Sequence, residues 1–244
     1  LYTDCGILTC DKRIGEDASA VFNMITGYSE PDEWNDLIVA PIWMKYSFLQ
    51  MIKDEENNAR AGKKAHIIAK MNALCEPMIM EALYKASAAG VKIDLIVRGI
   101  CSLKTGIPGV SENITVRSIV GNFLEHARIF YFYADGAEKV FMGSADWMPR
   151  NLDRRVEIVF PLKQENTKAD AMHILKVQLA DNVKARIMDA DGKYEKQDRR
   201  GKRPICAQDQ FCEEARLTQV LEKQVVENTR VFIPAEPMKE ENGE

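Results

Sequence analysis

The sequence predicts an α/β fold. Two observations carry this prediction: short apolar runs typical of buried strands alternate with segments of helical periodicity, and Gly, Pro, Asn or Asp mark the turns between them. The 244 residues are enough for one large or two medium domains. With 46% hydrophobic and 29% charged residues, the composition is that of a globular protein with a packed core.

The first half of the chain alternates helix and strand. Residues 14–26 place apolar side chains at helical spacing, and Gly27 can end that helix in a left-handed turn. There follow a buried strand at 37–42, a helix at 45–62, a strand at 65–74, a helix at 76–90 and a strand at 92–99. This alternation predicts parallel strands joined by right-handed crossovers. The change of pattern near residue 36 predicts a domain boundary.

The second half begins with a loop at 101–113 that is rich in Gly, Ser and Pro, and its position makes it a candidate lid. Further strands are predicted at 114–120, in a hairpin over 127–144 that turns at Asp135 and Gly136, and at 154–162. One amphipathic helix is predicted over 165–187. The remainder predicts an exposed hairpin at 189–196, a solvated basic run at 196–203 and a disordered acidic tail at 234–244.

Charge and composition exclude several classes of protein. The net charge of −4 argues against a basic protein that coats nucleic acid, so no nucleic-acid partner is expected. No apolar run has the roughly 18 residues that a membrane span requires, and no N-terminal segment reads as a secretory signal, so Leu1 is interpreted as a cut edge. Six scattered cysteines without a CxxC pair are typical of reduced thiols.

Basic residues nevertheless concentrate in the middle of the chain, where they could hold a polyanion locally. They are Arg98, Lys104, Arg117, Arg128, Arg150, Arg154 and Arg155. Ligands of parallel sheets gather beyond the carboxyl ends of strands, and Lys70, Asn72 and Arg98 are predicted at such ends. Lys70 and Asn72 could line a path for an anionic ligand or simply cap their strand. Because neighbouring strand residues face opposite ways, Arg154 and Arg155 cannot both point into one site.

One stretch combines groups suited to phosphoryl chemistry. His126 begins a predicted strand beside Arg128, and a Gly-Ser pair and Asp146 follow that strand. A histidine can act as nucleophile or as acid and base near neutral pH, while guanidinium groups neutralise phosphoryl oxygens. Asp146 is expected to orient an arginine or His126, and Trp147 to lie in the core. The other two histidines, His66 and His173, are expected to be structural.

The spacing H-x-R followed by G-S-x-D resembles the His-x-Lys and Gly-Ser-x-Asn elements of the phospholipase D superfamily. Arg128 stands where that superfamily has Lys, and Asp146 where it has Asn. These departures weaken an interpretation as a phosphodiesterase or nuclease, which stays open as an alternative. A noncatalytic polyanion-binding module is a second alternative.

The chain resembles one branch of that superfamily, the polyphosphate kinases, more closely. The motifs are LYTDCGILT, IIAKMNAL, GVKIDLIVRGICSL, RSIVGNFLEHARIFYF, GSADWMPRNLDRRVE and LADNVKAR, in family order from residue 1 to about residue 187. The resemblance implies a phospholipase D-like mixed sheet flanked by helices. It also implies that residues 1–36 are the tail of a first such domain and that residues 37–244 are a second one with C-terminal helices.

The resemblance further implies reversible transfer of the terminal phosphate of ATP to inorganic polyphosphate, through a phosphohistidine and with Mg²⁺. That histidine and the metal ligands would lie upstream of Leu1, so this chain alone is expected to be inactive and no metal ligand is assigned to it. A full-length enzyme is expected to form a homo-oligomer. It is expected to be cytoplasmic or peripherally associated with a membrane.

Site residues follow from the matching motifs. The resemblance makes His126 the second active-site histidine, Tyr2 a contact for the nucleotide base, and Arg98 and Arg155 ligands of ATP or phosphate. A guanidinium fork can hold phosphate oxygens bidentately, which agrees with these roles. The expected polyphosphate path comprises Lys70, Asn72, Arg128 and Arg150.

Overall fold

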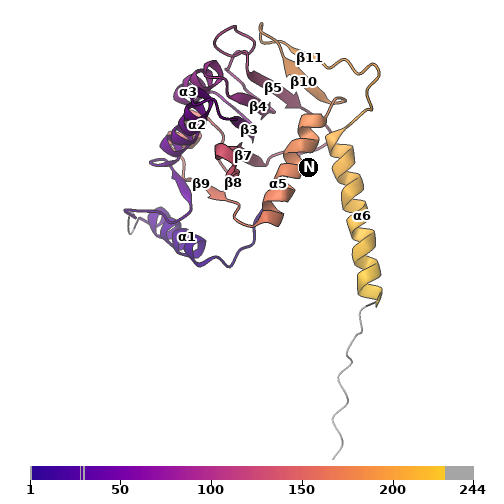
Figure 1. Cartoon of the computed structure of the whole chain (residues 1–244). Helices are drawn as coiled ribbons and strands as arrows, with labels where there is room; N and C mark the ends of the chain where they lie inside the picture. Colours follow the sequence, from indigo (N-terminus) through magenta and orange to yellow (C-terminus); the bar gives the residue numbers. More distant parts are fainter. Residues whose placement is uncertain (1, 28, 30, 229–244) are drawn as a thin grey trace, which may run out of the picture. The chain divides into compact units, whose positions relative to one another are not determined.

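Figure 1 shows the computed structural model of the chain, which describes residues 2–27, 29 and 31–228. The predicted acidic tail at 234–244 lies outside the described residues, as does Leu1. The described residues up to Ala207 form one compact unit, and those from Gln208 to Asn228 belong to a second. The division predicted near residue 36 therefore remains a prediction.

The first unit is built on a nine-stranded mixed sheet. In spatial order its strands are β11 (Tyr194–Lys196), β10 (Ala185–Met188), β5 (Ile114–Ile119), β4 (Lys92–Val97), β3 (His66–Met71), β7 (Arg128–Phe132), β8 (Lys139–Gly143), β9 (Glu157–Pro161) and β2 (Ile38–Ala40). The central strands β3, β4 and β5 are parallel, and every other pairing is antiparallel. The predicted parallel pairing of β3 with β4 and the predicted hairpin of β7 and β8 are both confirmed. The strand predicted at 37–42 does not join the parallel strands, because β2 lies at the edge of the sheet and pairs antiparallel with β9.

Helices cover both faces of the sheet. The described helices are α1 (Lys12–Ile25), α2 (Met44–Arg60), α3 (Pro77–Ala88), the short α4 (Pro149–Asp153), α5 (Glu165–Ala180) and α6 (Ala207–Asn228), with a 3₁₀ turn, η1 (Ala134–Gly136). In Figure 1, α2 and α3 lie on one face of the central strands and α5 lies on the other. None of the helices in the described part of the chain has the length and apolar content needed to cross a membrane.

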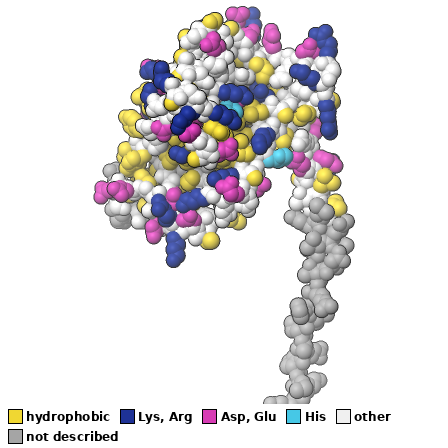
Figure 2. All heavy atoms as spheres, viewed as in Figure 1, with side chains coloured by type: hydrophobic (Ala, Val, Ile, Leu, Met, Phe, Trp, Pro, Cys, Tyr) yellow, Lys and Arg dark blue, Asp and Glu magenta, His cyan; other side chains and the backbone are white. Residues whose placement is uncertain are grey.

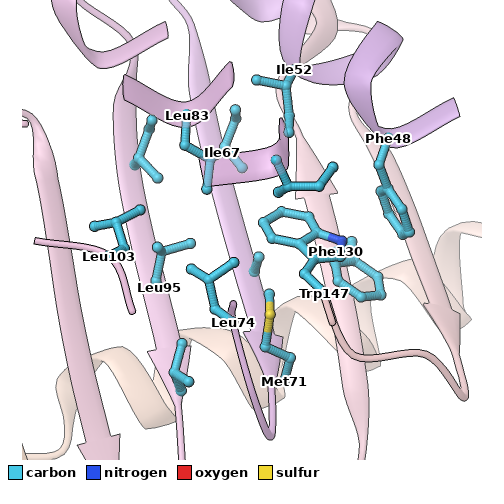
Figure 3. Close-up of a cluster of buried hydrophobic side chains, with 14 of the residues drawn as sticks. Phe48, Ile52, Ile67, Met71, Leu74, Leu83, Leu95, Leu103, Phe130 and Trp147 are labelled. Carbon is cyan, nitrogen blue, oxygen red and sulfur yellow. The ribbon is translucent and has the colours of Figure 1, made fainter. Parts of the chain in front are cut away.

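The two faces carry separate cores because side chains of a strand alternate. Residues Ile67, Ala69 and Met71 of β3 point toward α2 and α3, whereas Ile68 between them packs on the α5 side. In the first core (Figure 3) the ring of Trp147 stacks on Phe130 at a centroid distance of 5.4 Å and an interplanar angle of 22°. Trp147 is fully buried, so its predicted core position is confirmed.

Two sequence predictions were wrong at their ends. The strand predicted over 37–42 stops at Ala40, because Pro41 has no N–H for the sheet ladder. The helix predicted over 165–187 stops at Ala180, and the chain then turns into β10. The cause is Asp181, whose carboxylate accepts the backbone N–H groups of 183, 184 and 185 and replaces helical hydrogen bonds.

Helix α1 packs beside the edge strand β2. Val21 of α1 joins Leu37 and Val39 in a small third core. Asp17, almost fully buried, accepts the backbone N–H groups of Asp36 and Leu37 at 2.7 and 2.8 Å. These contacts fix the start of the sheet against the segment that precedes it.

All six cysteines are free thiols, as predicted.

Candidate functional site

A cavity of about 610 Å³ opens at the carboxyl ends of β3 and β4, where parallel sheets commonly bind ligands. Its polar and charged lining residues are Tyr2, Asp4, Asn72, Arg98, His126, Arg128, Ser144, Asp146, Arg150, Asn151, Arg155 and Glu157. The cavity thus brings together every residue expected in the nucleotide site or on the polyphosphate path except Lys70. Three members of the basic group, Lys104, Arg117 and Arg154, do not line it. The cavity also includes four residues that the sequence analysis did not assign to a site: Asp4, Ser144, Asn151 and Glu157.

Lys70 is not among the residues that line this cavity. It lies on β3 two residues after Ile68, on the α5 side of the sheet, and its side chain is only 5% exposed. Its Nζ donates to the carbonyl of Ala127 at 2.9 Å and pairs with Glu125 at 3.5 Å. Burial lowers the pKa of Lys70 despite the nearby carboxylate. A direct role on a polyphosphate path is therefore not supported by its placement.

The N-terminal segment reaches the site through a short parallel pairing. Strand β1 (Tyr2–Thr3) pairs with β6 (Leu124–Glu125), and the N–H of His126 extends this ladder by donating to the Thr3 carbonyl at 2.9 Å. The pairing places the ring of Tyr2 edge-on to His126 at 5.6 Å between centroids. Tyr2 is 74% exposed, so a face of its ring is available for stacking.

His126 is held by a carboxylate and a guanidinium. Its Nδ1 lies 2.7 Å from Asp4 Oδ2, and one terminal nitrogen of Arg128 lies 3.1 Å from both ring nitrogens. Partial burial opposes the charge of Asp4, but hydrogen bonds from His126 and the Cys5 N–H outweigh it and lower the pKa of Asp4. A carboxylate that orients an imidazole in this way prepares it for proton transfer.

A chain of hydrogen bonds connects this histidine to Arg98. Arg128 donates from Nε and a terminal nitrogen to the two oxygens of Asp146, at 3.1 and 3.3 Å. Asp146 also accepts the backbone N–H of Asn72 at 2.8 Å. The Oδ1 of Asn72 in turn accepts both Nε and a terminal nitrogen of Arg98, at 3.0 and 2.7 Å. The expectation that Asp146 orients an arginine thus matches the geometry.

Arg155 enters the cavity from the turn between α4 and β9. Strand β9 begins only at Glu157, so the premise that Arg154 and Arg155 alternate along a strand was wrong. Arg155 lines the cavity, and one of its terminal nitrogens lies 3.8 Å from Glu157. Buried Glu157 also accepts hydrogen bonds from Ser144 Oγ and Asn151 Nδ2.

Two glycines allow the backbone to pack closely around the cavity. A Cβ on Gly99 would lie 2.8 Å from the carbonyl oxygen of Asn72. A Cβ on Gly143 would lie 2.4 Å from the carbonyl oxygen of Ile158 on β9. Both distances are too short for any side chain, which gives a physical reason for Gly in the VRG and GSAD segments. Close packing of β8 on β9 lets Ser144 reach Glu157.

Among the described residues that line the cavity are arginines that are not paired with acids, although the chain as a whole carries a net negative charge. In Figure 2, basic and acidic side chains are interspersed over the visible face, so no extended field of one sign covers it. In the cavity, each of the three acids is bonded to a neighbour, whereas within the described part of the chain Arg98 and Arg150 form no ion pair. Such guanidinium groups can bind phosphate oxygens.

Metal ligands are not grouped here. Among the described residues, no set of three or more His, Cys, Asp or Glu side chains could hold a metal ion. His66 lies elsewhere, where its Nε2 contacts Asp94 at 2.8 Å beside a separate cavity.

Comparisons with known proteins agree with the sequence motifs. Residues 37–208 match the family described as polyphosphate kinase C-terminal domain 2. Polyphosphate kinases from Burkholderia ambifaria and Halalkalibacterium halodurans are 53% and 51% identical over 195 and 194 residues. Each match covers 80% of this chain, which spans only 28% of the length of these relatives. The crystal structure of polyphosphate kinase from Porphyromonas gingivalis matches with a TM-score of 0.83 at 36% identity, covering 87% of this chain and 33% of that one.

Proposed function

The chain belongs to the polyphosphate kinase family, and on that premise we propose that it forms the part of such an enzyme that binds ATP and polyphosphate. The complete enzyme would transfer the terminal phosphate of ATP reversibly to inorganic polyphosphate. One observation carries the proposal: a single cavity combines an exposed aromatic ring, a histidine oriented by a carboxylate, and four arginines.

The position of each residue in the cavity suggests its role. Tyr2 would stack on the nucleotide base, because its ring is the most exposed aromatic surface of the cavity. Arg98 and Arg155 would bind phosphate oxygens, and Arg128 and Arg150 would continue the anionic path. These groups would neutralise the charge that develops on the transferring phosphoryl oxygens.

His126 would act as an acid and base toward a phosphate oxygen. Asp4 holds its Nδ1 side, which fixes the ring orientation and leaves Nε2 as the nitrogen that can face a substrate oxygen. The nucleophilic histidine that the family resemblance implies is a different residue. His126 is the only histidine among the residues that line the cavity, so we expect the isolated chain to bind substrates without turning them over.

The family resemblance implies Mg²⁺, and the described residues contain no group of three or more His, Cys, Asp or Glu side chains that could hold it. The carboxylates of the cavity already serve His126, Arg128 and Ser144. Mg²⁺ often reaches kinases bound to substrate phosphates with few protein ligands. We expect its protein ligands to come from other parts of the enzyme. A cytoplasmic location and assembly into a homo-oligomer are further expectations from the resemblance.

The proposal is tested by titrating long-chain polyphosphate into the chain at two salt concentrations, by calorimetry. Arg98→Ala/Arg155→Ala should lose salt-sensitive binding, because two phosphate ligands are removed. The matched control Arg13→Ala/Arg60→Ala removes the same charge from two exposed arginine side chains outside the cavity and should bind as the unaltered chain does.

Three results would contradict parts of this proposal. Equal binding by both double variants would place the polyanion elsewhere, most simply on the basic run that contains Arg199 and Arg200. Metal-dependent polyphosphate synthesis by this chain would contradict its expected inactivity. Cleavage of a generic phosphodiester, lost in His126→Ala, would favour the phosphodiesterase alternative.

A further inference from the structure

We propose that Asn72 and Asp146 form a positioning relay that sets the direction of the Arg98 guanidinium in the cavity. This inference rests on the proposed function, in which Arg98 binds a phosphate group. Neither relay residue needs to touch the phosphate. Both act through the arginine, and both are nearly buried, with 9% and 7% of their surfaces exposed.

Asp146 is the fixed end of the relay. It receives Nε and a terminal nitrogen of Arg128, and the backbone and side-chain nitrogens of Asn72 at 2.8 and 3.4 Å. A carboxylate accepts hydrogen bonds but donates none. The amide nitrogen of Asn72 therefore faces Asp146, and its oxygen must face the other way.

Arg98 is the directed end. The Asn72 oxygen receives two N–H groups of Arg98, at 2.7 and 3.0 Å. The backbone supports the same contact, since the N–H of Gly99 donates to the Asn72 carbonyl at 2.8 Å. Two of the five N–H groups of the guanidinium are thereby engaged, and the others are left for a ligand. A reversed amide would place its NH₂ against the guanidinium, where two donors meet.

The relay explains why an anion-binding cavity contains a buried carboxylate. As a simple negative charge, Asp146 would repel phosphate, and neutralising it would tighten anion binding. As the fixed end of a relay, Asp146 instead improves binding by holding Asn72 and, through it, Arg98. The first view predicts that Asp146→Asn tightens anion binding. The second predicts that the same substitution weakens it.

The experiment measures binding of inorganic tripolyphosphate to the 244-residue chain by calorimetry. Asp146→Asn should weaken binding roughly tenfold, the effect of one lost hydrogen bond to a charged group. Asn72→Leu, which changes shape little and charge not at all, should weaken it by a similar factor. Asp94→Asn is the matched control, because Asp94 is also a buried carboxylate of this sheet but lies outside the cavity. Its binding should equal that of the unaltered chain.

A second readout reports the relay directly. The Nε–H of Arg98, assigned by its disappearance in Arg98→Lys, gives a signal in a proton–nitrogen NMR spectrum. In both relay variants that signal should shift and exchange faster with water, since its acceptor is lost or reversed. A structural change elsewhere, as in Asp94→Asn, should leave it in place.

The outcomes separate the relay from the proposed function. Tighter binding by Asp146→Asn, or an unchanged Arg98 signal in folded Asn72→Leu, would overturn the relay. If the unaltered chain binds neither tripolyphosphate nor ATP, the proposed function fails, while the Arg98 signal still decides whether the relay exists. Should Asp146→Asn fail to fold, Asn72→Leu carries both measurements.

Discussion

Replacing Gly143 by alanine should destabilise the chain through a clash that no side-chain rotation can relieve. The added Cβ would lie 2.4 Å from the carbonyl oxygen of Ile158, 2.6 Å from Cγ2 of Val159 and 2.8 Å from its Cα. Two of these three atoms belong to the backbone of β9, which is paired with β8 at this position. Strand β9 must therefore move away from β8 as a unit.

The expected loss of unfolding free energy follows from these distances. Overpacking that forces backbone shifts costs about 1–3 kcal/mol, and three contacts below 3 Å place Gly143→Ala at the upper end of that range. For a chain of this size a loss of about 3 kcal/mol lowers Tm by roughly 6–12 °C. Gly99→Ala, with one such contact, at 2.8 Å, should lose less.

Urea unfolding followed by circular dichroism measures the free energies. The control is Gly15→Ala in α1, where a Cβ meets nothing within 4 Å and alanine should stabilise the helix by about 0.5–1 kcal/mol. The predicted clash is refuted if the free energy of unfolding of Gly143→Ala lies within about 0.5 kcal/mol of that of the unaltered chain. It is also refuted if Gly99→Ala proves the more damaging of the two.

Two further predictions concern buried carboxylates. Burial opposes the charge of Asp94, but hydrogen bonds from His66 and Lys92 outweigh it and lower its pKa below the ordinary 3.8. Near and below that value the unfolded chain binds more protons, so the stabilisation is present above pH 3.8 and lost as pH falls through the folded pKa. The difference in unfolding free energy between the unaltered chain and Asp94→Asn should shrink over that window, and a constant difference would contradict the assignment. Asp181→Ala should lower the free energy of unfolding in urea by about 2–4 kcal/mol, because buried Asp181 accepts four backbone N–H groups, including that of Ala207. A loss below about 1 kcal/mol would show that these N–H groups find other acceptors.

The central sheet was predictable because burial on both faces makes its strands continuous apolar runs. The runs around Ile67 and Leu95, with a helix between them, are sufficient to predict the parallel unit. Trp147 could be placed in the core because tryptophan side chains are highly buried on average. Local periodicity therefore accounts for the two strands at whose carboxyl ends the cavity opens.

The pairing of β1 with β6 was not predictable from local patterns. Each strand has two residues, and the partners Tyr2 and Leu124 are far apart in the sequence. Asp4 was missed for the same reason: only this pairing brings it to His126. The available signal was the segment LYTDCGILT, in which Asp4 stands two residues after Tyr2. The orientation of Lys70 depends on strand register, which the run IIAKM does not fix because both of its faces are apolar.

The acidic residues of the cavity are best understood as orienting groups. Asp4 holds His126, Asp146 holds Arg128 and Asn72, and Glu157 holds Ser144 and Asn151. A cavity lined only by freely moving arginines would attract any polyanion in any arrangement. Fixed guanidinium directions instead favour oxygens at defined positions, since bidentate hydrogen bonds depend on geometry as well as charge. Carboxylates that lower the total positive charge of such a cavity can therefore increase its selectivity for an anion that presents its oxygens at those positions.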